Sequence, residues 1–243
     1  MCKMLVEQKQ NFDKECETYL QMLEGEIKNT GFDFGYIHEY KVLDLKLEAK
    51  KVFDISSNLN ILDFGCGIGL SLPYLKKHFP NSNLYACDYS KKSVEMCISN
   101  NKHIQGLTVM PTNGIDMPYE ENFDIIFIAN VIRHIPRANQ NTVLQNLKSH
   151  LTKDGMILMY EFNPWNPVSL YFYYKEDRNY DPENVRIMSP LYAKKLFKSS
   201  GFKSVVTKYR FFIPNCFKKL VQIENYLKKV PLGANYYIVA KND

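Results

Sequence analysis

Short apolar runs alternate with amphipathic segments through the middle of the chain. Five runs predict strands, at about 60–64, 84–88, 107–110, 123–129 and 156–162. The fourth run is apolar at neighbouring positions, as expected for a parallel strand buried on both faces. Three- and four-residue spacing predicts helices between them, at about 70–78, from Ser90 onward, and at 138–151. This alternation predicts an α/β fold with a Rossmann-like, doubly wound sheet.

The flanking segments extend this core. Upstream, apolar spacing predicts helices at about 5–30 and 36–54, which we interpret as an N-terminal helical cap of residues 1–55. Downstream, a helix at about 189–200 precedes strands at about 203–212 and 235–241. The segment between these strands can return the chain as a hairpin, so we expect seven strands with the last antiparallel. The domain 56–243 then carries insertions at 163–188 and 214–232.

A glycine-rich turn follows the first predicted strand, where ligands bind in open parallel sheets. Its candidate binding residues are Asp63, Gly65, Cys66, Gly67 and Gly69. The spacing G-x-G-x-G differs from the G-x-G-x-x-G of pyrophosphate-binding turns. An acidic residue before the turn suits a cationic ligand such as S-adenosylmethionine (SAM), which carries an ammonium and a sulfonium. The alternative is an ordinary tight strand-to-helix turn.

Two further strand ends carry polar residues. Asp88 can accept both hydroxyls of a ribose, or it can cap the helix that follows, and Tyr89 can lie against an adenine ring. After the third strand, Asn113 can pair with the adenine amino group, while Gly114 and Ile115 lie against the ring. The alternative for this segment is a polar surface loop.

Together these pieces resemble the class I SAM-dependent methyltransferases. The resemblance covers roughly 60–240 and is carried by residues 61–69, 85–90, 117–118 with 123–126, and 151–156. It implies SAM as cofactor, S-adenosylhomocysteine (SAH) as product, and a ribose-binding role for Asp88. The position of Asn113, often Asp in the family, binds the adenine amino group, and the backbone at Asn130 lines the methionine end.

The acceptor side is less defined by the sequence. Residues 163–167 and 211–233 resemble bacterial methyltransferases presumed to act on small molecules or saccharides. We therefore expect O- or N-methylation of a small molecule by in-line displacement, in which positioning makes a catalytic residue dispensable. His134 is a candidate general base, although a structural role is favoured. Candidate acceptor residues are Tyr36, Tyr40, Trp165, Tyr171, Tyr173 and Tyr174, with Arg178 and Arg186 for an acidic acceptor.

Composition narrows the alternatives. The net charge of +5 is low for a nucleic-acid binder, and 163–167 follows the fifth strand, whereas the similar N-P-P-Y motif of DNA amino-methyltransferases follows the fourth. Six scattered cysteines fit neither a metal site nor disulfides, so we expect reduced thiols in a cytoplasmic protein. The N-terminus lacks the pattern of a signal peptide, and no apolar stretch is long enough for a transmembrane span, so we expect neither. The remaining alternatives are an NAD-dependent oxidoreductase, a non-catalytic SAM-binding scaffold subunit, and methylation of a lipid-linked saccharide. In the last case, lysines 218, 219, 228 and 229 would dock a helix on an anionic membrane.

Overall fold

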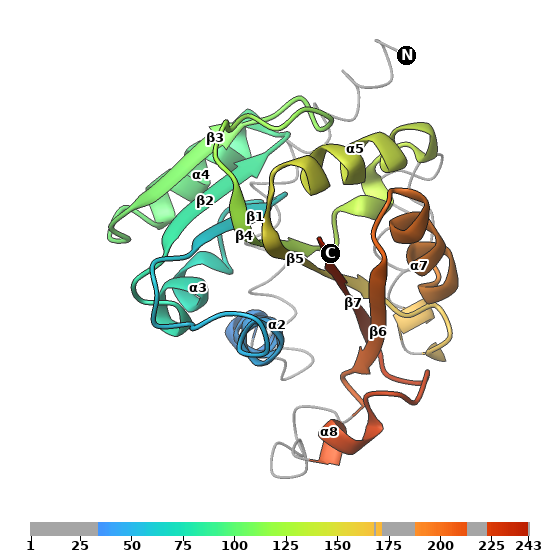
Figure 1. The fold of residues 1–243 in the computed structure, drawn as a ribbon. Helices are drawn as coiled ribbons and strands as arrows, with labels where there is room; N and C mark the ends of the chain where they lie inside the picture. Colours follow the sequence, from blue (N-terminus) through green and yellow to red (C-terminus); the bar gives the residue numbers. More distant parts are fainter. Residues whose placement is uncertain (1–33, 168, 172–187, 213–222, 243) are drawn as a thin grey trace.

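The computed structural model describes residues 34–167, 169–171, 188–212 and 223–242. Seven strands form one sheet of order β3-β2-β1-β4-β5-β7-β6 (Figure 1). The strands are β1 Asn60–Phe64, β2 Asn83–Asp88, β3 Leu107–Pro111, β4 Phe123–Ala129, β5 Leu151–Phe162, β6 Ser204–Arg210 and β7 Asn235–Lys241.

The direction of the strands confirms the predicted fold. Strands β1 to β5 pair in parallel, and β7 lies between β5 and β6, antiparallel to both. The chain builds β2 and β3 on one side of β1, then crosses to the other side to build β4 and β5. The carboxyl ends of β1 and β4 therefore meet at the point where the winding reverses, and ligands bind at this point in such sheets.

Helices cover both faces of the sheet (Figure 1). They are α2 Phe34–Ala49, α3 Leu72–His78, α4 Lys91–Asn100, α5 Arg137–Ser149, α7 Pro190–Ser199 and α8 Glu224–Leu227, with a 3-10 turn Ile132–His134. Alternate strand residues feed two cores: Ile61 packs with α2, α3 and α4, whereas Leu62 packs with α5 and α7. The apolar runs seen in the sequence are thus buried on both faces.

Two helices begin at capping serines that stand where the sequence predicted these helices to start. The Ser90 hydroxyl accepts a hydrogen bond from the Ser93 amide at 3.0 Å, and the Ser189 hydroxyl accepts one from the Tyr192 amide at 3.2 Å. Each bond satisfies an amide that has no partner within its helix.

The fifth strand begins earlier than predicted. It starts at Leu151 rather than Met156, so α5 ends at Ser149, and Asp154 and Gly155 lie within the strand rather than in a turn. The pairing with β4 is irregular between Phe123 and Ile125, and this irregularity accommodates the polar start. A side chain at Gly155 would come within 2.9 Å of the Thr152 carbonyl oxygen. The polar residues at the start of β5 therefore mark an irregularity within the strand and not a turn before it.

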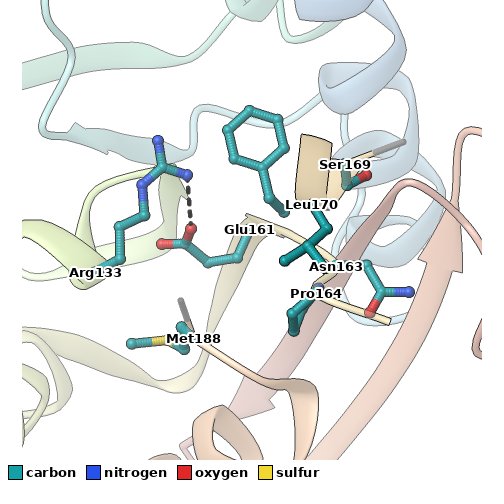
Figure 2. Close-up of a pocket in the computed structure, with 8 residues that line it drawn as sticks. Arg133, Glu161, Asn163, Pro164, Ser169, Leu170 and Met188 are labelled. Carbon is teal, nitrogen blue, oxygen red and sulfur yellow. Dashed lines mark hydrogen bonds and ion pairs between the residues drawn. The ribbon is translucent and has the colours of Figure 1, made fainter. Parts of the chain in front are cut away.

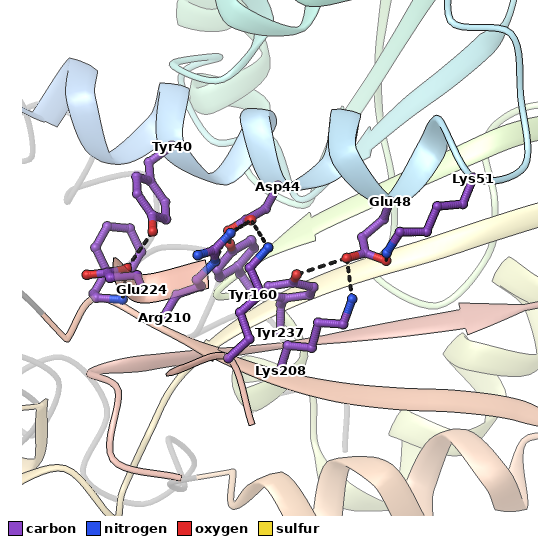
Figure 3. Close-up of polar contacts among 11 residues, drawn as sticks. Tyr40, Asp44, Glu48, Lys51, Tyr160, Lys208, Arg210, Glu224 and Tyr237 are labelled. Atoms are coloured by element: carbon purple, nitrogen blue, oxygen red, sulfur yellow. Dashed lines mark hydrogen bonds and ion pairs between the residues drawn. The ribbon is translucent and has the colours of Figure 1, made fainter. Parts of the chain in front are cut away.

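Helix α2 ends at Ala49, before the expected residue 54, and buries a charged face against the sheet (Figure 3). Asp44 accepts hydrogen bonds from the Tyr160 hydroxyl at 2.5 Å and from Arg210 Nε at 2.7 Å. One turn further on, Glu48 Oε1 accepts from Lys208 Nζ at 2.5 Å. These contacts join the first described helix to β5 and β6.

Some predicted segments lie outside the described residues, namely the helix at 5–30, most of insertion 163–188, and residues 214–222 of the second insertion. Of insertion 214–232 the structure describes α8 and its flanks. Lys228, one of the lysines considered for membrane docking, approaches buried Asp44 at 4.0 Å, whereas Ile223 is 47% exposed. Lys229 is exposed, so among the described lysines of this segment only Lys228 turns inward, toward the Asp44 carboxylate. In the described ranges, no helix is long and apolar enough to cross a bilayer.

Candidate active site

The glycine-rich turn after β1 is fixed on two sides and open on one. Gly65 has φ +75°, and a Cβ there would lie 2.4 Å from Val131 Cγ2, in the segment after β4. A Cβ at Gly69 would lie 2.3 Å from Asn101 Nδ2 on the α4 side. Gly67, with φ +53°, would place its Cβ in open space. The turn is therefore open at Gly67, where a ligand could approach the backbone closely.

Asp88, at the end of β2, connects this turn to α4. Its Oδ2 accepts a hydrogen bond from the Gly67 amide at 2.8 Å, and its Oδ1 accepts one from the Ser90 amide at 2.9 Å. Asp88 thus ties the turn to the start of α4, where Ser90 is the N-cap, and its ribose-binding role stays a prediction.

The loop after β3 lies beside Tyr89, the residue that follows Asp88. Gly114, with φ +81°, would place a Cβ 3.3 Å from the ring of Tyr89, so the loop backbone and this ring lie side by side. The Asn113 side chain is bound within its own loop: its Nδ2 donates to Asp116 Oδ2 at 2.7 Å, and its Oδ1 accepts from the Ile115 amide at 2.9 Å. An adenine contact by Asn113 would require these bonds to open, and it stays a prediction.

Asn130, after β4, has an unusual conformation for a non-glycine residue. Its φ is +60°, and its amide donates to the Tyr160 carbonyl at 3.0 Å. Its side-chain Oδ1 is buried and has no hydrogen-bond partner among the described residues. Strained backbone of this kind clusters at ligand sites, and an unmatched carbonyl oxygen suits an ammonium group.

Asp63 supplies a second acidic group to the same place. It is 3% exposed, and burial together with the charge of Asp88 raises its pKa to about 7, while Lys41 opposes this rise. Next to it, Cys66 Sγ lies 3.8 Å from Cys97 Sγ, and this contact together with burial raises the pKa of the Cys66 thiol. Cys66 is therefore a protonated wall residue. Within the described ranges no group of acidic, His or Cys residues is arranged to hold a metal.

Arg133 organises the segment after Asn130 (Figure 2). Its Nη1 donates to Glu161 Oε2 at 3.3 Å, its Nε donates to His134 Nε2 at 3.2 Å, and its guanidinium lies 4.7 Å from the centre of the Phe162 ring. Burial and the charge of Arg133 lower the pKa of His134 to about 3. His134 is thus neutral and accepts a hydrogen bond through Nε2, the lone pair that a general base would use.

A small, partly open cavity of about 10 Å³, enough for roughly one water molecule, lies beyond the carboxyl end of β5 (Figure 2). Its lining consists of Arg133, Glu161, Phe162, Asn163, Pro164, Ser169, Leu170 and Met188. Asn163 Nδ2 donates to the Gly233 carbonyl at 2.8 Å, and Ser169 Oγ donates to the Ala234 carbonyl at 2.5 Å. Since these two side chains hold the loop, Arg133 and Glu161 give the cavity its charged character.

Comparisons with known proteins identify this arrangement. A family of methyltransferase domains matches residues 62–157, which include the glycine turn, Asp88 and Asn130. A SAM-dependent methyltransferase from Thermotoga maritima superposes with a TM-score of 0.63, covering 97% of this chain and 100% of its own at 14% identity. The plantazolicin methyltransferase BpumL, solved with SAH, superposes with a TM-score of 0.63 at 15% identity and covers 99% of this chain and 100% of its own.

Residues 62–157 thus match a methyltransferase domain, and the fold of the chain is similar to that of solved SAM-dependent methyltransferases. Among curated relatives, a malonyl-[acyl-carrier protein] O-methyltransferase of Bacillus cereus is 26% identical over 46% of this chain and 41% of its own. The human tRNA N(3)-cytidine methyltransferase METTL6 is 23% identical over 63% of this chain and 58% of its own length. The chain thus spans about two fifths of the first of these relatives, and the acceptors named differ widely.

None of the predicted acceptor aromatics that the structure describes lines the cavity. Tyr40 is buried, and its hydroxyl donates to Glu224 at 2.5 Å, so it belongs to the contact between α2 and α8. The ring of Tyr36 lies 5.8 Å from that of Tyr40. Trp165 stacks on Tyr209 at 6.4 Å, and Tyr171 is 62% exposed. Tyr173, Tyr174, Arg178 and Arg186 lie outside the described residues.

The sequence interpretation did not include two charged residues of this site. Glu161 lies in the apolar strand β5, and its charge at the carboxyl end of a buried strand was a usable signal. Lys41 lies on α2 and is 4% exposed. Its position was not readable, because the docking of α2 depends on partners far along the chain.

Proposed function

We propose that this chain transfers the methyl group of SAM to an oxygen or nitrogen of a small molecule that binds at the open side of the cavity beyond β5. One observation carries the proposal: the segment 130–134 connects the glycine turn to the cavity. Val131 packs on Gly65 at one end of this segment, and Arg133 lines the cavity near the other. A cofactor on the turn and an acceptor at the open side of the cavity would therefore be neighbours.

The residues of the turn fit SAM. Asp88 offers lone pairs to the ribose, Tyr89 with the loop at Gly114 offers a wall for the adenine, and the open side at Gly67 admits the backbone of the ligand. Asp63 and the Asn130 Oδ1 offer acceptors to the ammonium group. When bound, SAM supplies a methyl carbon already activated by its sulfonium.

The work left to the protein is positioning and exclusion of water. Orientation of two reactants can supply roughly 7–11 kcal/mol of the barrier. Phe162, Leu170 and Met188 give the cavity apolar walls that exclude water, and the Arg133–Glu161 pair fixes the polar end. His134 holds the Arg133 side chain through its Nε2 and is assigned a positioning role.

Incubation with methyl-labelled SAM tests the acceptor class. Metabolite extract, lipid-linked saccharides and tRNA form three separate arms, because named relatives include tRNA enzymes. We expect label in soluble small molecules. Label confined to tRNA or to the lipid fraction would contradict the proposed acceptor class, and tight SAH binding with no label in any arm would favour a scaffold subunit.

The Asp88→Ala variant provides the control for cofactor use. Loss of the hydrogen bonds to ribose should weaken SAH binding by roughly 1.5–3 kcal/mol, the range for bonds to a charged group. Glu95→Ala, on the exposed face of α4, removes the same charge and should leave the affinity unchanged. Calorimetry that shows equal SAH affinity for both variants would contradict the ribose assignment.

A further inference from the structure

A nearly buried lysine on α2 makes no hydrogen bond to any residue that the structure describes. Lys41 is 4% exposed, and its ammonium lies 5.8 Å from the centre of the Tyr160 ring. No hydrogen bond or ion pair joins its Nζ to any described residue. Burial of an ammonium with three donors and without direct partners is costly. The Tyr160 ring offsets part of this cost, and the three N–H donors stay available to a ligand.

The position of Lys41 is fixed by its own helix. Three residues before it, His38 Nδ1 is hydrogen-bonded to Ser71 Oγ at 3.0 Å, just beyond the glycine turn. Three residues after it, Asp44 is bound to Arg210 and Tyr160 (Figure 3). Lys41 is therefore held between the glycine turn and the end of β5.

The charges around Lys41 place it at the cofactor site. Its ammonium is close enough to Asp63, Arg133 and Glu161 for their charges to act on it, and burial with the charge of Arg133 lowers its pKa to about 8. Asp63 in turn feels the charges of both Asp88 and Lys41. The charged groups thus follow one another from the ribose side of the turn, through Asp63 and Lys41, to the pair that lines the cavity.

Arg133, the other buried cation here, is already engaged. Its Nη1 donates to Glu161, its Nε donates to His134, and its plane lies over Phe162. Lys41 differs because its three N–H donors make no bond to a described residue. An anion that enters this site therefore meets the Lys41 ammonium as its most available donor.

We propose that Lys41 binds the carboxylate of the methionine part of SAM. This inference rests on the proposed function. The methionine part is a zwitterion, and the site offers matching groups: Asp63 and the Asn130 Oδ1 for its ammonium, and Lys41 for its carboxylate. The bound carboxylate gives the buried ammonium the hydrogen bonds that the protein does not.

Calorimetry with two ligands tests this assignment. SAH carries the carboxylate, whereas 5′-methylthioadenosine lacks the whole amino-acid part but shares the adenosine. In Lys41→Met we expect SAH affinity to fall roughly 10- to 100-fold, while methylthioadenosine affinity stays at the wild-type value. Lys50→Met, an exposed lysine just after α2, should change neither affinity.

The wild-type protein gives an independent measurement if the variant folds poorly. Wild type should bind SAH at least roughly 10-fold more tightly than decarboxylated SAH, which keeps the ammonium and lacks the carboxylate. Equal affinity for these two ligands, or a parallel loss of SAH and methylthioadenosine in Lys41→Met, would overturn the assignment and leave the proposed function standing. Binding of no adenosyl ligand to wild type would overturn the proposed function itself.

Discussion

The glycines of the turn after β1 have different physical reasons to be glycine. All adopt positive φ, but a side chain at Gly65 would overlap Val131, whereas one at Gly67 would extend into open space. Gly106 shares this conformation at +74°, far from the turn, and its nearest neighbour would lie 3.9 Å away. Substitution at Gly106 therefore tests backbone strain alone, at Gly65 strain with steric overlap, and at Gly67 strain with obstruction of a ligand.

Alanine at each position should give three different outcomes. Gly106→Ala should cost about 1–2 kcal/mol of unfolding free energy, the strain of a left-handed residue. Gly67→Ala should cost a similar amount and also weaken SAH binding, because its methyl group occupies the ligand side. Gly65→Ala should be the least stable, since overlap adds to strain. Urea unfolding and calorimetry measure both quantities, and unchanged SAH affinity in Gly67→Ala would argue against a ligand there.

The other residue-scale prediction concerns His134 and pH. Its pKa is about 3 in the folded chain, below the ordinary value near 6.5, so the unfolded chain binds the extra proton between these values. Its contribution to stability is therefore complete above about pH 6.5 and is lost as the pH falls toward 3. The difference in unfolding free energy between wild type and His134→Asn should narrow from pH 7.5 to 5.5. A constant difference would contradict the lowered pKa.

Kinetics of the same variant separate the two roles of His134. A positioning residue should lower melting temperature and methyl transfer together when replaced. A general base should lower turnover by roughly 10²–10⁴-fold with unchanged SAH affinity and melting. We expect the first outcome, because the Nε2 lone pair already accepts from Arg133.

At the scale of elements, α2 is attached to the sheet by charge as much as by apolar contact. Its apolar residues Val42 and Leu45 join the core with α3 and α4, while Asp44 and Glu48 are buried beside them. Both carboxylates find their cations on β6, where Lys208 and Arg210 lie two residues apart and point to the same face.

Breaking this attachment on one side should be costly. Asp44→Ala leaves the Arg210 guanidinium buried without its carboxylate, and we expect a loss of about 3–5 kcal/mol in unfolding free energy. Combining it with Arg210→Met should recover most of that loss, because neither charge then remains. Lys77→Ala breaks the exposed pair with Glu39 and should cost at most about 1 kcal/mol. Additive losses in the double variant would contradict the coupling.

Features set by neighbouring residues could be predicted from the sequence, and features set by residues far apart in the chain could not. Strands β1, β4 and β7 were predicted with their observed bounds, because burial on both faces leaves continuous apolar runs. Asp63, the glycines and Asp88 were found because they follow strand ends directly. The start of β5 was missed because a strand irregularity and a polar turn share a composition. Lys41 was missed because its place depends on Asp44 and Arg210, 166 positions apart.

For the whole molecule, cofactor binding should appear as stability. A ligand that binds only the folded state at 100 times its Kd adds about 2.7 kcal/mol. For a chain of this size that corresponds to a rise of roughly 5–11 °C in melting temperature. SAH should produce this rise, and NAD at the same concentration should not. Thermal melting with both ligands measures the difference, and equal shifts would argue for a dinucleotide site.

The bonds from α2 to β6 also constrain when the site is completed during translation. Asp44 and Glu48 cannot leave water cheaply until Arg210 and Lys208 have been synthesised, some 160 residues after Glu48. Until β7 is made as well, β5 keeps an unpaired edge open to other chains. A nascent chain can thus form the glycine turn early, yet it gains the wall that carries Lys41 only once the closing hairpin has left the ribosome.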